Sequence, residues 1–204
     1  MRRIAILAVL VPLLVPATGW SQTRQQQPPA PPPGAEATEQ LLMTPPPGWN
    51  IQGSGANRNS VTKQLFPPGQ TSETWNEMMT IQVLADATAV PRDYIQRIIE
   101  ASRNNCEASG PSPLNEALTN GYPVATLTVT CTKGRQTGLG GLVAAKVIRG
   151  KAALYVVQRI WRGTAFNRDE VPPIPKDMLQ DWAAFLRGVS VCDTADPTHH
   201  PCPK

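Results

Sequence analysis

The stretch LVAAKVIRGKAALYVVQRIWR, residues 142–162, decides the fold of this chain. It holds two runs rich in β-branched and other apolar residues, Leu142–Ile148 and Ala153–Arg162, on either side of the tripeptide Arg149–Lys151. Runs of this composition, bounded by residues that permit a turn, are typical of strands. The stretch therefore predicts a β-hairpin.

A second hairpin is predicted directly upstream. Asn120 and Gly121 lie between two extended runs, and Asn-Gly favours a two-residue hairpin turn because both central positions adopt positive φ. In the run that follows, apolar residues alternate with threonines, which is the period of a strand with one buried face. The apolar members of this run are Ala125, Leu127, Val129 and Cys131.

Shorter strands and two helices are expected in the rest of the chain. Trp49–Gln52, Val61–Phe66 and Met79–Val83 have the composition or the alternation of strands. Apolar residues at helical spacing predict one helix that begins at Pro91 and a second over residues 175–188. The pattern predicts an α+β fold, in which an antiparallel sheet of five to seven strands packs with two main helices.

The N-terminal part has the pattern of an export signal. Two arginines precede an apolar run of 12 residues, Ile4–Val15, and small residues follow it. The run is shorter than the about 20 apolar residues of a membrane-crossing helix, so we expect no transmembrane span; an uncleaved signal anchor is the alternative. We expect a signal peptide over 1–21, a Pro- and Gln-rich disordered linker over 22–38, and a single domain over 39–204 that is periplasmic or secreted.

The charge of the chain argues against a nucleic-acid partner. The formal net charge is +4, from 19 basic and 15 acidic residues, and loss of the expected signal with its two arginines leaves +2. This balance is too small for a protein that binds a polyanion by charge alone. Export would also separate the protein from nucleic acid.

Three stretches of the chain are similar to an exported proteobacterial family of unknown function. They are Pro47–Trp49, Ala153–Arg162 and the C-terminal part Val191–Pro203. The expected order of elements also resembles the PsbP-like fold. The resemblance implies a noncatalytic periplasmic accessory or binding role, and it supplies no catalytic residue.

The sequence contains no recognisable catalytic constellation. Its two histidines, His199 and His200, are adjacent in a Pro-flanked tail, which is a poor place to hold a general base against a nucleophile. Ser60–Lys63 matches the S-x-x-K motif of penicillin-binding enzymes, but the S-D-N and K-T-G elements are missing. We therefore expect a protein that is not an enzyme and that uses no cofactor.

The four cysteines indicate two disulfides, since an even number in an exported chain favours pairing. Three connectivities are possible, and we favour the local one, in which Cys106 pairs with Cys131 and Cys192 with Cys202. The alternative is a metal site, because thiolate and imidazole suit zinc or copper. Its ligands would be Cys192, His199, His200 and Cys202, in a spacing that does not match a standard zinc signature.

One basic segment supplies a candidate binding surface. Between Lys133 and Arg168 there are eight basic residues and no acidic one, whereas residues 71–116 carry seven acids and three arginines. Side chains at alternate strand positions share a face, so the segment could present a basic patch to an anionic envelope component or an acidic protein. The expected members of this patch are Lys146, Lys151, Arg159 and Trp161. The alternative is that these are solvated outward positions.

The sequence thus favours a noncatalytic exported accessory or binding protein of the cell envelope. A periplasmic carrier of a small ligand or a metal is the second hypothesis, and an enzyme of unrecognised type is the third. A hydrophobic ligand pocket beside Trp49 and Trp75 is a further hypothesis, although large aromatic residues more often belong to the core.

Overall fold

The computed structural model describes residues 38–86 and 88–203. The expected signal peptide and residues 22–37 of the expected linker lie outside the described residues. In the described part of the chain, no helix is long and apolar enough to cross a membrane.

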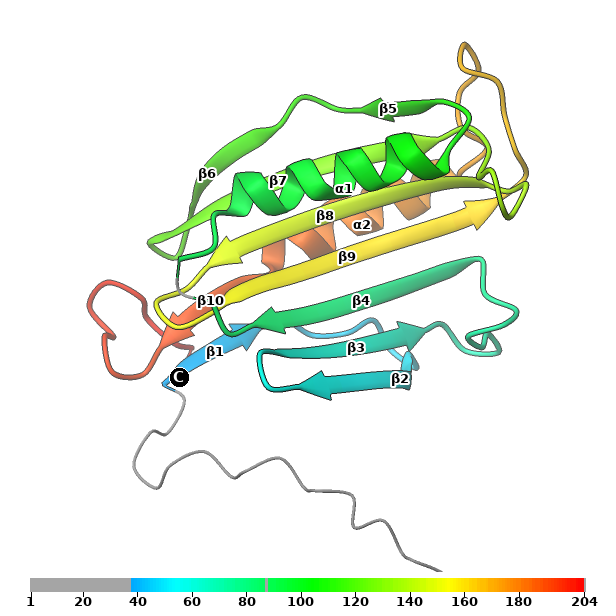
Figure 1. Ribbon diagram of the computed structural model, residues 1–204. Helices are drawn as coiled ribbons and strands as arrows, with labels where there is room; N and C mark the ends of the chain where they lie inside the picture. The colour runs from blue at the N-terminus through cyan, green and yellow to red at the C-terminus, as the bar shows by residue number, and fades with distance from the viewer. Residues whose placement is uncertain (1–37, 87, 204) are drawn as a thin grey trace, which may run out of the picture. The chain divides into compact units, whose positions relative to one another are not determined.

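The larger of two sheets has eight strands, and every pairing in it is antiparallel (Figure 1). These strands are β2 Asn50–Asn57, β3 Ser60–Phe66, β4 Glu77–Leu84, β5 Ser109–Pro111, β6 Asn115–Thr119, β7 Tyr122–Cys131, β8 Gly140–Arg149 and β9 Leu154–Gly163. Seven of them follow the order β2-β3-β4-β9-β8-β7-β5, and β6 also pairs with β7. The smaller sheet joins β1, Glu39–Leu42, to β10, Ser190–Asp193.

The expected α+β fold with a sheet of five to seven strands is wrong. The described residues form mainly antiparallel β-structure, with eight strands in one sheet and two in the other. Strands β1 and β10 have only four residues each, and β5 has three. Segments this short carry no readable period, so their pairing depends on distant parts of the chain.

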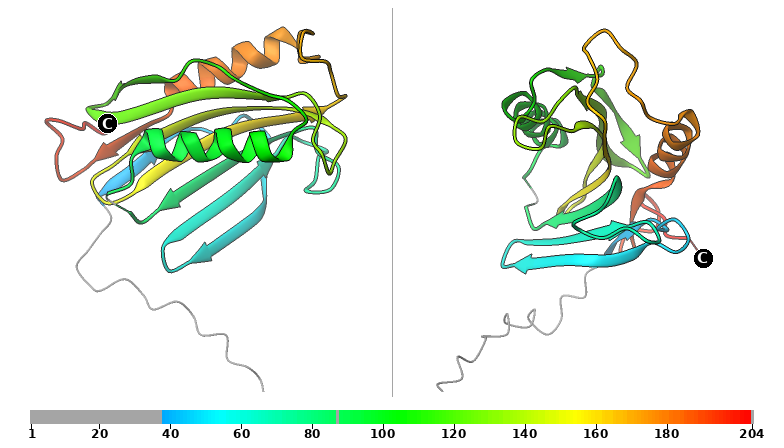
Figure 2. Two further views of the ribbon diagram at one scale, coloured as in Figure 1. Left: turned by 45° about the horizontal axis from the view of Figure 1, so that its top comes forward. Right: turned by 90° about the vertical axis from the view of Figure 1, so that its right-hand side faces the viewer.

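Two helices lie on opposite faces of the larger sheet (Figure 2). Helix α1, Pro91–Asn105, begins at the predicted proline, whose fixed φ suits the first turn. Helix α2, Lys176–Gly188, lies within the predicted range and follows Pro175. Both helices are amphipathic, and each buries its apolar side against the sheet.

One face of the sheet packs against α1. Ile95 and Ile99 of the helix contact the residues that alternate along β7, which confirms the predicted buried face of that strand. The sheet side of this cluster consists of Ala125, Leu127, Val129, Ala145, Val147, Leu154 and Val156. Burial of side chains of this size typically contributes about 1.5–3 kcal/mol each to folding.

The other face packs against α2 and the small sheet. Leu142, Ala144 and Trp161 contact Trp182 of α2, while Ile148 and Tyr155 pack against Val191 of β10. Strands β8 and β9 are therefore covered on both faces. Double coverage is the physical reason that residues 142–162 are almost continuously apolar rather than alternating.

The Asn-Gly hairpin joins β6 to β7 and also anchors the C-terminal segment. Asn120 has φ +47° and Gly121 has φ +80°, as the predicted turn requires. The Asn120 side chain donates hydrogen bonds to the carbonyls of Val191, at 2.8 Å, and Pro201, at 3.0 Å. The His200 ring stacks on Tyr122 with ring centroids 3.8 Å apart, so the turn and the C-terminal segment form one packed unit.

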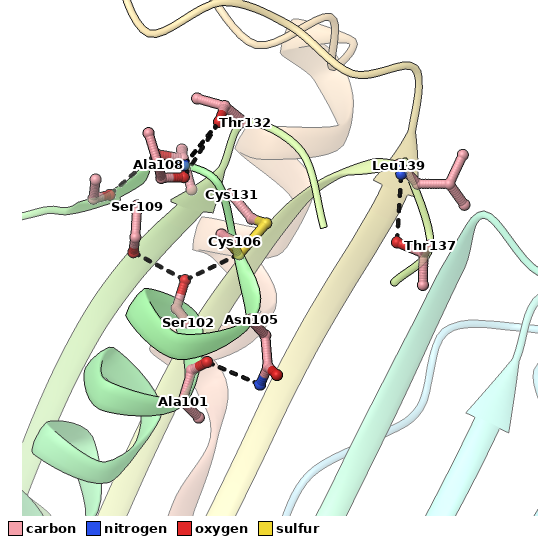
Figure 3. The surroundings of a disulfide bond; sticks show 12 residues. Ala101, Ser102, Asn105, Cys106, Ala108, Ser109, Cys131, Thr132, Thr137 and Leu139 are labelled. Atoms are coloured by element: carbon pink, nitrogen blue, oxygen red, sulfur yellow. Dashed lines mark hydrogen bonds between the residues drawn. A yellow bond between two sulfur atoms is a disulfide. The ribbon is translucent and has the colours of Figure 1, made fainter. Parts of the chain in front are cut away.

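Both disulfides have the connectivity that the sequence favoured. The first joins Cys106, directly after α1, to Cys131 at the end of β7 (Figure 3). Beside it the hydroxyl of Ser102 lies 2.8 Å from that of Ser109 and 3.6 Å from the Cys106 sulfur. The second joins Cys192 of β10 to Cys202. A bridge that closes a loop of this size typically contributes about 2–4 kcal/mol.

Candidate ligand groove

The four residues of the expected basic patch occupy very different environments. Lys146, Arg159 and Trp161 share one face of β8 and β9, as the alternation predicts, but α2 covers that face. Their exposed fractions are 6 %, 4 % and 7 %. Lys151 lies in the β8–β9 turn and its side chain is 49 % exposed. The four side chains therefore do not form one exposed patch, because a second layer covers the strands that carry three of them.

Arg159 is enclosed by protein groups. Its guanidinium forms an ion pair with Glu77 of β4 and lies 4.6 Å from the ring centroid of Trp49 and 5.4 Å from that of Trp182. The Trp182 indole N–H donates to the same Glu77 carboxylate at 2.5 Å. Aromatic faces attract a cation electrostatically, so these contacts hold α2 and the Trp49 segment against the sheet.

Lys151 is bound within the protein to two carboxylates. Its Nζ lies 2.9 Å from Asp193 and 2.9 Å from Asp196. The hydrogen bonds from Lys151 lower the pKa of both carboxyl groups, and those same bonds raise the pKa of Lys151. The Asp193 side chain is only 3 % exposed, so this ion pair fastens β10 to the β8–β9 turn.

The residues of the alternative metal site are occupied by other contacts. Cys192 and Cys202 are bonded to each other and have no thiolate to offer a metal. The His200 Nδ1 lies 2.9 Å from the Asn120 carbonyl, and the His199 Nδ1 lies 2.8 Å from an Asp196 oxygen. Across residues 38–86 and 88–203, no three His, Cys, Asp or Glu side chains are placed to share a metal ion.

A groove of about 540 Å³ lies between α2 and strands β6, β7 and β8. Its apolar lining is drawn from all of these elements and includes Leu118, Leu142, Ala144, Leu179, Trp182 and Leu186. Leu118 is 71 % exposed and Leu179 is 39 % exposed, although both border this concave surface. The volume is within the range of about 300–1,000 Å³ that is usual for small-molecule sites.

Two cations and no carboxylate border this groove in the described chain: Lys146 from β8 and Arg187 from the last turn of α2. The Lys146 Nζ donates to the carbonyl of Leu186 at 2.9 Å and to that of Val189 at 2.5 Å. These carbonyls are at the C-terminal end of α2, where the helix dipole favours a cation. Burial nevertheless lowers the pKa of Lys146.

Other hollows of the described surface have less distinctive chemistry. One of about 570 Å³ lies beside the Cys106–Cys131 bridge, and its cation is Arg162. That guanidinium donates to the carbonyls of Trp75 and Glu73 and stacks on the Trp75 ring, so its charge is already bound within the protein. Another, of about 480 Å³, is bordered by apolar residues of β3 and β4 and by the exposed Lys63.

The groove beside α2 could not be recognised along the sequence, because four separate segments line it. One signal was present, since the apolar stripe that predicts a helix over residues 175–188 includes Leu179, which the sheet leaves partly exposed. The stripe is therefore wider than the surface that covers it. Lys146 was singled out by the sequence, but as a member of an exposed patch.

Comparisons with known proteins assign no family to the chain. No family model matches it, and no curated protein matches it. A similar solved structure is that of LpqN, described as involved in cell envelope biogenesis of Mycobacterium tuberculosis. The sequences are 14 % identical, the match covers 78 % of this chain and 87 % of that chain, and the TM-score is 0.42. The resemblance to a PsbP-like fold is not confirmed.

Proposed function

We propose that this chain is a noncatalytic, exported binding protein of the cell envelope, and that the groove beside α2 receives the apolar part of a small ligand. The observation that carries the proposal is the groove itself, which combines an apolar lining with a few polar groups. Sites of this kind bind by burying apolar ligand surface and use their polar groups for orientation.

The cysteines and the N-terminal pattern support export. Every cysteine in the described residues belongs to a disulfide, and disulfides of this kind persist in oxidising compartments. The signal expected over 1–21 would deliver the chain to such a compartment. We expect the exported protein to begin at Gln22 or within a few residues of it.

The environment of the nucleophile and base candidates supports a noncatalytic role. Described cysteines are oxidised, and His200 is held by the Tyr122 stack and the Asn120 carbonyl. In these contacts the cysteines and His200 have a structural role. The chain therefore binds its ligand without a chemical step.

The groove can be tested with N-phenyl-1-naphthylamine, an uncharged probe whose fluorescence rises in apolar sites. The protein is expressed with its own N-terminus and recovered from the soluble envelope fraction. We expect saturable binding of one probe per chain. Ala183→Phe should weaken it by about tenfold or more, because Ala183 lines the groove and the added ring would fill it.

The neighbouring residue supplies the control. Ala184 is exposed on the same helix but does not line the groove, so Ala184→Phe should bind the probe as the parent does. Circular dichroism and melting temperature establish that both variants fold. Equal probe affinity of the two folded variants, or no saturable binding by the parent, would refute this site.

A further inference from the structure

We infer that the ligand of the groove is an amphiphilic anion, with its acidic headgroup at Lys146 and Arg187 and its aliphatic chain along the apolar wall. The inference rests on the proposed function and specifies the chemistry of the ligand. It follows from the charge of the groove, the environment of the Lys146 ammonium and the distribution of apolar residues.

The charge of the groove is one-sided. Lys146 and Arg187 line it, and none of its lining residues in the described chain is acidic. In the described residues, no carboxylate lies within 4.0 Å of the Lys146 Nζ, whereas Arg159, Lys151 and Lys133 all have acidic partners. A surface with cations and no anions attracts an anionic group.

Lys146 retains the capacity to bind such a group. An ammonium has three N–H donors, and the carbonyls of Leu186 and Val189 accept two of them. Carbonyl dipoles offset a buried charge only in part, and the lowered pKa of Lys146 reflects the remaining cost of burial. An anionic oxygen of a ligand within reach of the Nζ would supply a counter-charge and accept the third hydrogen bond.

The apolar wall accounts for the rest of the ligand. Leu142, Ala144 and Trp182 form a buried floor, and Leu118 and Leu179 extend the apolar surface to the two rims. Side chains with hydroxyl or amide groups, among them Thr126, Thr128 and Asn115, also line the groove. An aliphatic chain would cover the floor and rims and lose its exposure to water.

The test compares ligands that share a chain and differ in their headgroup. Dodecanoate, dodecyl phosphate, dodecan-1-ol and dodecyltrimethylammonium are each used below their micellar concentration to displace N-phenyl-1-naphthylamine. We expect the two anions to bind about tenfold or more tightly than the alcohol, because a charge-assisted hydrogen bond is stronger than a neutral one. The cation should bind more weakly than the alcohol. Acetate, which has no chain, should not displace the probe.

Two variants test whether Lys146 and Arg187 cause the preference for an anionic headgroup. Lys146→Gln keeps amide donors for the carbonyls of α2 and removes the charge, so the preference for the anion should fall to about twofold or less. Arg187→Gln should reduce it in part. Lys63→Gln is the matched control, because Lys63 borders a different apolar hollow and its loss should leave the preference unchanged.

The outcomes separate the inference from the proposed function. If the parent binds dodecanoate and dodecan-1-ol equally, the headgroup assignment is wrong while the groove remains a binding site. If the parent binds the probe and none of the four amphiphiles displaces it, the ligand class is wrong as well. If Lys146→Gln does not fold, the parent headgroup series and Arg187→Gln still decide the question, because Arg187 is exposed.

Discussion

Basic residues of the segment 133–168 differ in role because their surroundings differ. Arg159 is enclosed between a carboxylate and aromatic rings, Lys146 contacts the end of α2, and Lys151 holds two aspartates. The sequence gives the charge of each residue but not which other elements pack against it. Neutralising these residues together would therefore disturb three different interactions and would not isolate a binding surface.

We expect Lys151→Gln to weaken the protein most between pH 5 and pH 8. The pKa values of Asp193 and Asp196 are lowered in the folded state, mainly by hydrogen bonds from Lys151. A lowered carboxyl pKa stabilises the fold above the ordinary value of about 3.9, and this contribution is lost as the pH falls through the folded pKa. The parent should therefore melt higher than the variant at pH 6, and the difference should shrink below about pH 4.

The neighbouring Arg149 provides the comparison. It is exposed in the same turn region, and in the described chain it has no ion pair. Melting curves of Arg149→Gln should follow the parent at every pH. A gap between the parent and Lys151→Gln that is as large at pH 3 as at pH 6 would contradict the proposed linkage.

At the scale of elements, the β6–β7 hairpin depends on its turn and on the segment packed against it. Gly121 has positive φ, and a Cβ added there would lie 2.7 Å from the backbone oxygen of His199. The C-terminal segment that approaches so closely is held by the Cys192–Cys202 bridge. The turn residue therefore affects both the hairpin and the position of this segment.

We expect Gly121→Ala to cost more stability than Gly138→Ala. Gly138 also has positive φ, +68°, but nothing lies within 4 Å of an added Cβ. Strain in the left-handed region should make Gly138→Ala destabilising by about 1–2 kcal/mol, and Gly121→Ala should lose this amount plus the cost of moving the His199 segment. Urea unfolding of both variants measures the difference, and equal losses would show that the close approach is relaxed without cost.

At the scale of the whole molecule, all three tyrosines of the chain are withdrawn from solvent: Tyr122 and Tyr155 are buried and Tyr94 is partly buried. Tyr94 packs from α1 onto the sheet, while Tyr122 and Tyr155 pack on the opposite face beside the small sheet. Burial is the largest cause that raises the pKa of each phenol, and the Glu39 carboxylate raises it further for Tyr122 and Tyr155. Glu39 also accepts hydrogen bonds from the backbone N–H groups of Lys151 and Ala152.

The folded protein should therefore resist tyrosine ionisation. Free tyrosine is half ionised near pH 10, whereas we expect little absorbance change at 295 nm at that pH until the protein unfolds. A raised phenol pKa contributes stability below pH 10 that is lost as the pH rises further. The protein in guanidinium chloride should titrate near pH 10. Reversible ionisation of more than one tyrosine near pH 10, with an unchanged circular dichroism spectrum, would contradict the described packing.

Features that depend on neighbouring residues could be predicted from the sequence. Positive φ at Asn120 and Gly121, the start of α1 at Pro91 and the buried alternation of β7 follow from backbone preferences and periodicity. The local disulfide pairing also agrees with the structure, in which the two bridges join cysteines that are 25 and 10 residues apart.

Features that depend on which layer covers which face were decided only by the tertiary structure. The larger sheet is wider than expected because β5 is too short to have a readable period, and the separate β1–β10 sheet was not predicted for the same reason. Lys146 and Arg159 lie at alternating strand positions, which would be exposed in a sheet with one covered face. In the structure α2 covers these positions and both residues are buried. The groove exists because α2 covers part of that face and leaves the part toward β6 and β7 open. Coverage is set by contacts between residues far apart in the chain, which local propensity does not encode.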